Sequence, residues 1–90
     1  MTIEQDTAAG GLAQRQLRLN DGVIVVASIS VRSFKRSHQL YGYLQFKRDK
    51  KTVTRYVGNV TAETKLEALV IGWRKLREMH LVEENGWMWV

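Results

Sequence analysis

The chain has 90 residues, of which 44% are hydrophobic and 26% are charged, and it contains no cysteine. This length allows one hydrophobic core and therefore one domain, and the lack of cysteine excludes disulfides and thiolate metal sites. The most apolar stretch, residues 23–31, is far shorter than the roughly 20 residues that cross a bilayer. The N-terminus is acidic and lacks the apolar run of a signal peptide, so we expect a cytoplasmic protein without membrane contact.

Positive charge is concentrated in the middle of the chain. The net charge is +5, and ten of the 14 Lys and Arg residues fall within residues 12–58, where only Asp21 and Asp49 are acidic. A basic patch of this kind concentrates polyanions near it. A charged surface that serves only solubility has the same composition, so the charge alone does not separate these two interpretations.

Residues 1–11 are small and polar and end in two glycines, which predicts a mobile tail ahead of a single domain over residues 12–90. Residues 12–19 alternate leucine with polar side chains towards their end, as a half-exposed strand does. Asn20-Asp21-Gly22 has the chemistry of a tight turn. The apolar side chains of residues 23–31 fall on both parities, which predicts one central strand covered on both faces.

A basic loop over residues 32–39 leads to a predicted hairpin with strands at residues 40–48 and 51–59. Lys47 lies opposite Thr52 whether the connecting loop has two or four residues. One face is apolar and is expected to face the core: Leu40, Gly42, Leu44, Phe46, Val53 and Val57. Arg55 also falls on this face, and we expect it at a sheet edge with its stem packed and its head in water.

A helix is predicted over residues 61–80, with Thr61 as its N-cap and Glu63 in the first turn. Its apolar stripe consists of Leu66, Leu69, Val70, Trp73 and Leu76. Residues 87–90 form either a short strand or an arm that reaches a neighbouring molecule. The order β-β-β-β-α, with a possible short C-terminal strand, predicts an α+β fold: one small antiparallel sheet packed on one face by a single amphipathic helix.

The second face of the hairpin carries side chains that suit nucleic acid. Tyrosines stack on bases or sugars, Gln and Thr offer hydrogen bonds at strand spacing, and the lysines and arginine at the tip bind phosphates. The residues are Tyr41, Tyr43, Gln45, Lys47, Arg48, Lys50, Lys51, Thr52, Thr54 and Tyr56. A second basic group in the preceding loop, Arg32, Lys35 and Arg36, would extend the phosphate contacts. A solvent-facing strand surface also favours tyrosine and threonine, which is the alternative interpretation.

Catalysis has little support in the sequence. His38 and His80 are far apart and belong to no metal-binding or catalytic spacing. Glu63 and Glu67 are one helical turn apart, a pattern typical of surface charge. We therefore predict a protein that is not an enzyme and that holds neither a cofactor nor a metal.

Trp87 and Trp89 share a face if the C-terminus is a strand. They would then complete a small core, which a domain of this size needs. The alternative is a hydrophobic contact with a protein partner or with a second copy of the chain, because aromatic residues anchor interfaces.

The run YGYLQFKRDKKTVTRYVGNVTAETKLEALVIGWRKL, residues 41–76, resembles the three-stranded-sheet-plus-helix DNA-binding modules of integrase arm-type domains and AP2-type factors. The shared features are strands with a basic turn, then Gly58 and a Thr-x-Glu approach to an amphipathic helix. In those families the sheet enters the major groove. The resemblance thus implies a role in base reading or backbone contact for Tyr43, Gln45, Lys47, Thr52 and Thr54.

The same stretch is similar to an uncharacterised bacterial family with a Tyr-x-Tyr-Leu…Lys-Thr-x-x-Arg-Tyr-Val hairpin before a helix, here Tyr41, Tyr43, Leu44, Lys51, Thr52, Arg55, Tyr56 and Val57. We predict a small accessory or regulatory protein that binds nucleic acid, with DNA preferred to RNA on the resemblance. The alternative is a protein-interaction module, a subunit or inhibitor of a nucleic-acid-handling complex, that uses the basic patch and the C-terminal tryptophans.

Overall fold

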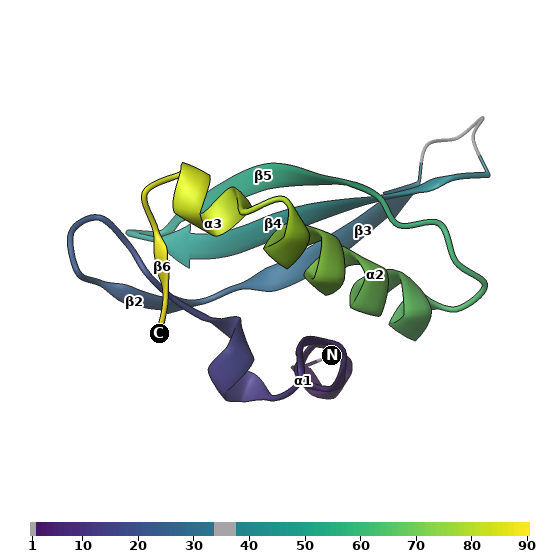
Figure 1. Ribbon diagram of the computed structural model, residues 1–90, viewed down its shortest axis with the longest axis horizontal. Coiled ribbons are helices and arrows are strands. Elements are labelled where there is room, and N and C mark those ends of the chain that lie inside the picture. The colour runs from purple at the N-terminus through teal and green to yellow at the C-terminus, as the bar shows by residue number, and fades with distance from the viewer. Residues whose placement is uncertain (1, 34–37) are drawn as a thin grey trace.

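The computed structural model describes residues 2–33 and 38–90, and their arrangement confirms the predicted α+β class (Figure 1). The elements in chain order are α1 (Thr2–Ala9), the 3-10 helix η1 (Leu12–Arg15), β1 (Gln16–Arg18), β2 (Ile24–Val26), β3 (Ser28–Ser33), β4 (Leu40–Arg48), β5 (Lys51–Asn59), α2 (Lys65–Glu78), α3 (Leu81–Glu84) and β6 (Met88–Trp89). Within these described ranges, no helix has the length and apolar character that crossing a membrane requires.

The strands form two antiparallel sheets where the sequence predicted one. The larger sheet has the order β3-β4-β5, and the smaller sheet has the order β2-β1-β6. Figure 1 shows α2 and α3 on one side of the larger sheet. Helix α1 lies next to α2 and contacts the edge strand β3 through Gln5. The C-terminal residues add a short strand to the smaller sheet, in which Met88 pairs with Arg18. Of the two predicted alternatives for this segment, the structure has the strand rather than the arm.

The single strand predicted over residues 23–31 divides at Ala27, which is fully buried between the two sheets. The N–H of Ala27 donates to the carbonyl of Arg15, and its own carbonyl accepts from Arg15 Nε at 2.9 Å. The Arg15 guanidinium also bonds Ser28 Oγ and the carboxylate of Asp6. These contacts direct β2 towards β1 and away from β4. Ile24 and Val26 are therefore exposed rather than covered.

The region before β1 also differs from its prediction. Residues 12–15 form η1 where a strand was predicted, and α1 occupies the segment predicted to be a mobile tail. The amide of Gln5 explains the docking of α1, because its two ends bond the backbone N–H and carbonyl of Ile29. Asp6 adds the ion pair with Arg15.

The predicted hairpin is confirmed, including Lys47 opposite Thr52. The loop has two residues, Asp49 and Lys50, with φ angles of 53° and 64°. Two successive left-handed residues are the geometry of the hairpin turn that matches strand twist. The register shifts between Gly42 and Tyr43, so β4 and β5 carry an irregularity at the end far from the tip.

Helix α2 begins later than predicted. Its N-cap is Thr64, whose hydroxyl accepts from the N–H of Glu67, so Glu67 rather than Glu63 lies in the first turn. The hydroxyl of Thr61, the predicted cap, instead accepts from the N–H of Leu40. This contact ties the approach segment to the start of β4. The helix ends before His80, which adopts a left-handed conformation.

The buried side of α2 is rotated relative to the predicted stripe. Leu66 and Val70 are exposed, whereas Ala68 and Gly72 are buried with Leu69, Trp73 and Leu76. Gly72 explains the rotation, because a Cβ at this position would lie 2.9 Å from Ile29 Cγ2. The helix packs closely on the sheet where its side chains are smallest.

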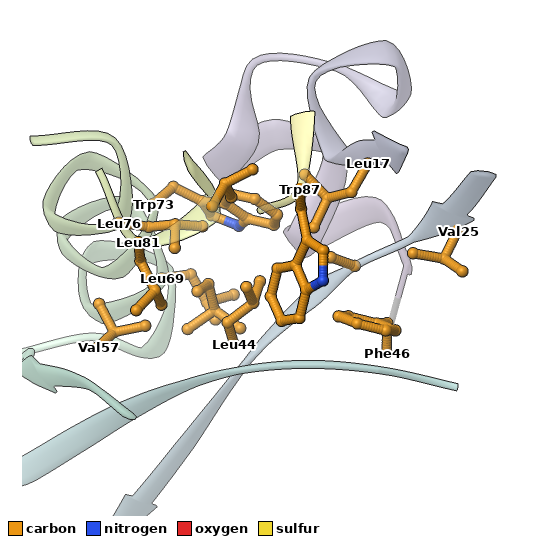
Figure 2. Packing of buried hydrophobic residues seen from close by; sticks show 13 residues of the cluster. Leu17, Val25, Leu44, Phe46, Val57, Leu69, Trp73, Leu76, Leu81 and Trp87 are labelled. Carbon is orange, nitrogen blue, oxygen red and sulfur yellow. The ribbon is translucent and has the colours of Figure 1, made fainter. Parts of the chain in front are cut away.

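The core lies between α2 and the larger sheet and continues under α3 and β6 (Figure 2). Trp87 is 8% exposed and its ring meets Phe46 edge to face, with the centroids 5.1 Å apart. Arg55 lies opposite Leu44 at the edge strand β5, exposed, with Nε bonded to Asn85 and its guanidinium 5.5 Å from the Trp87 ring centroid. The edge placement predicted for this arginine is thus confirmed.

Candidate nucleic-acid interface

The side of the larger sheet opposite α2 carries the polar and aromatic side chains that the sequence assigned to it. Successive rows cross the sheet because the strands are in register and alternate residues share a face. The rows are Arg32 and Tyr41; Ser30, Tyr43 and Tyr56; Ser28, Gln45 and Thr54; and Lys47 and Thr52. All of these side chains are exposed or half-buried, so this side of the sheet, which we call the open face, is accessible to a large ligand.

Three tyrosines form the aromatic part of this face. The Tyr43 and Tyr56 ring centroids are 5.3 Å apart, and Tyr41 lies 6.5 Å from Tyr56. The Arg32 guanidinium covers the Tyr43 ring at 4.6 Å from its centroid. Tyr56 is 52% exposed, so among the three rings it offers the largest surface for stacking.

The hairpin tip carries the cations, but they are not equivalent. Lys47, Lys50 and Lys51 are exposed. Arg48 is ion-paired with Asp21 in the β1–β2 turn and with Asp49 at the hairpin turn. The hydrogen bond from Arg48 lowers the pKa of Asp21, helped by the N–H of Val23, and the same pair raises the pKa of Arg48. Arg48 therefore links the tip to the neighbouring turn. The sequence predicted that this arginine would contact phosphate.

The second basic group is only partly placed. Arg32 belongs to β3, which extends through Ser33 into the predicted loop, and its side chain contributes to the face. Lys35 and Arg36 lie outside the described residues.

Sequence reasoning missed the contribution of β3. Ser28 and Ser30 lie beside Gln45 and Tyr43 and complete the rows. The alternation of Ser28, Ser30 and Arg32 with the apolar residues Ile29 and Val31 was a detectable signal. The apolar residues on both parities of residues 23–31 predict one strand covered on both faces, and this prediction conceals the alternation.

A groove of about 550 Å³ opens where β2 diverges from the end of β4. Its β2 side is formed by residues 23–26, and its other side includes Ser28, Gln45, Lys47 and Thr52 of the open face. Phe46 and the ion-paired Arg48 also line it. The groove thus joins exposed apolar side chains to polar ones beside the tyrosines.

In the part of the chain that the structure describes, no group of three or more His, Asp or Glu residues is placed to bind a metal ion. His80 Nδ1 lies 3.0 Å from Glu83 Oε2, an exposed contact that lowers the pKa of Glu83. Comparisons with protein-family models, curated proteins and solved structures found no match to this chain.

Proposed function

We propose that the protein binds nucleic acid through the open face of β3, β4 and β5 and through the lysines of the hairpin tip. One observation carries this proposal: the exposed Tyr56 ring lies next to Tyr43 on a strand face that leads to exposed Lys47 and Lys51. Aromatic rings on a sheet stack bases, and nearby lysines bind phosphates, whatever the sequence of the polymer.

The resemblance stated from the sequence favours DNA over RNA. The role that suits so small a binding face is accessory or regulatory, and it requires no catalytic group. The net charge of +5 supports association with a polyanion, because it raises the local concentration of phosphate chains at low salt.

A protein-interaction module is the second candidate, and a different surface from the predicted one supports it. Trp87 is in the core and Trp89 is half-buried, so the tryptophans offer little area to a partner. The outer face of the smaller sheet exposes four apolar side chains, Ile24, Val26, Met88 and Val90. A contact through this face would change little with salt, unlike phosphate binding.

The test is fluorescence anisotropy with labelled single-stranded DNA, duplex DNA and RNA at several salt concentrations. Lys47→Ala/Lys51→Ala removes two tip charges and leaves the Arg48–Asp21 ion pair in place. Lys65→Ala/Arg74→Ala is the matched control, because it removes the same charge from exposed positions on α2. We expect the tip variant to lower the slope of log affinity against log salt by about 1 to 2, and the control to change it little.

The aromatic contribution is tested separately. Tyr56→Ala should weaken binding by about 5- to 160-fold without changing the salt slope, because stacking releases no counterions. If no polymer binds the native protein at low salt, the proposal is wrong. If the tip variant and its control behave alike, the hairpin is not the binding element.

A further inference from the structure

We infer that the groove between β2 and β4 accepts an unpaired nucleobase, so that the preferred ligand is a single strand rather than a duplex. This inference rests on the proposed function and assigns the ligand class of the same face. Its basis is the groove itself, which the divergence of β2 at Ala27 creates, together with the position of the hairpin tip beside the β1–β2 turn.

The lining of the groove suits the chemistry of a base. A nucleobase has flat apolar faces and hydrogen-bonding edges. The exposed side chains of Ile24 and Val26 provide apolar contact, and the Gln45 amide and the Thr52 hydroxyl provide donors and acceptors. The Ser28 hydroxyl accepts from Arg15 and keeps its own proton to donate. The volume of about 550 Å³ lies within the range of small-ligand pockets.

The backbone of β2 adds further hydrogen-bonding groups at this site. The direction of backbone hydrogen bonds alternates from residue to residue along an antiparallel strand. The Val23 carbonyl accepts from the N–H of Leu19, and the N–H of Ala27 donates to the Arg15 carbonyl, so both residues bond towards β1 and its flanking residues. The N–H and carbonyl groups of Ile24 and Val26 therefore point to the opposite edge. Because β2 is an edge strand of the smaller sheet, these groups face the side on which the groove opens.

The position of the groove relative to the tyrosines favours a strand that spans both. Gln45 and Thr52 lie one and two rows of side chains from the Tyr43–Tyr56 row, and successive rows are about 7 Å apart. A strand with one base stacked on Tyr56 can place a neighbouring base at the groove, with its phosphates near Lys47.

The hairpin tip supports the same ligand class. A two-stranded ribbon that reads a duplex enters the major groove, which is about 12 Å wide. Here the tip lies beside the β1–β2 turn, where Arg48 and Asp21 form an exposed ion pair, so the hairpin does not project alone. Together the tip and the turn form a broad surface, which suits an unpaired strand whose bases are accessible from one side.

The test compares three labelled probes of equal length: oligothymidine, an abasic strand with the same phosphates, and a duplex. The groove variants are Gln45→Leu and Thr52→Val, which keep side-chain size and remove hydrogen-bonding groups. Thr7→Val makes the same change as Thr52→Val at an exposed position on α1 and serves as the matched control. Circular dichroism and thermal unfolding confirm that each variant is folded.

Native protein should bind oligothymidine more tightly than the duplex at equal salt. Each groove variant should weaken oligothymidine binding by about 2- to 10-fold, the size of a lost neutral hydrogen bond, and leave abasic-strand binding unchanged. If the groove variants have no effect while Lys47→Ala/Lys51→Ala weakens binding and lowers the salt slope, the proposed function stands and the groove assignment is wrong. If the native protein binds no probe, both are wrong.

Discussion

Arg15 joins three parts of the fold, and its replacement by alanine should cause a large loss of stability. Its side chain is 5% exposed and donates to the Ala27 carbonyl, to Ser28 Oγ and to the carboxylate of Asp6. Loss of the arginine leaves the buried Ala27 carbonyl without its side-chain donor and frees α1 from its ion pair. Breaking a buried ion pair costs about 3 to 5 kcal/mol. The Asp6 side chain is 36% exposed and regains water, so we place the loss at about 3 kcal/mol.

Urea denaturation followed by tryptophan fluorescence measures this loss. The free energy of unfolding of a domain of this size is about 5 to 13 kcal/mol, and the urea dependence is about 1 kcal/mol per M. The midpoint should therefore fall by about 3 M. Arg15→Met keeps the apolar stem and separates packing from the polar contacts. Arg18→Ala, at an exposed position on β1, should change stability by less than about 0.5 kcal/mol.

The reasoning is refuted if Arg15→Ala costs no more than the Arg18→Ala control. In that case the polar contacts of Arg15 would contribute nothing to the separation of β2 from β3. The groove beside β4 would then need another cause.

Two further predictions concern α2 and the hairpin tip. Gly72→Ala should destabilise the protein by about 1 to 2 kcal/mol, because the new methyl overlaps Ile29. This cost should exceed the gain from the better helix propensity of alanine. Thermal unfolding measures the change, and a gain in stability would contradict the close packing of α2 on the sheet. Arg48 lowers the pKa of Asp21, so the ion pair stabilises the protein above the unfolded-state pKa of about 3.9 and loses this effect as the pH falls through the folded-state value. The stability difference between the native protein and Asp21→Asn, measured by urea denaturation, should therefore be largest near pH 7 and vanish at low pH, and a constant difference would show that the charge of Asp21 is unimportant.

Local patterns determined the hairpin and the position of the main helix. Alternation over residues 40–48 and 51–59 assigned the two faces, and burial of Leu44, Phe46 and Val57 follows that assignment. These features depend on neighbours in sequence: side-chain alternation along a strand and a tight two-residue turn. The binding role of the open face stays a prediction.

Other features depend on contacts between residues distant in sequence, and no local pattern could provide them. Ala27 interrupts an apolar run because Arg15, twelve residues away, binds its carbonyl. Residues 2–9 form a docked helix because the Gln5 amide bonds the backbone N–H and carbonyl of Ile29, 24 residues away. The start of α2 depends similarly on a distant contact. The Thr61 hydroxyl accepts from the N–H of Leu40, and the hydroxyl of Thr64 caps the helix instead.

The site is divided in the same way. The sequence by itself determined which side chains of the hairpin share a face, because alternation along a strand is local. Only the tertiary structure decided that Arg48 is paired with Asp21, that β3 supplies Ser28 and Ser30, and that a groove opens beside β2. The physical reason is that pairing between strands and burial of an arginine depend on which distant segments meet, and a residue's neighbours in sequence do not specify these contacts.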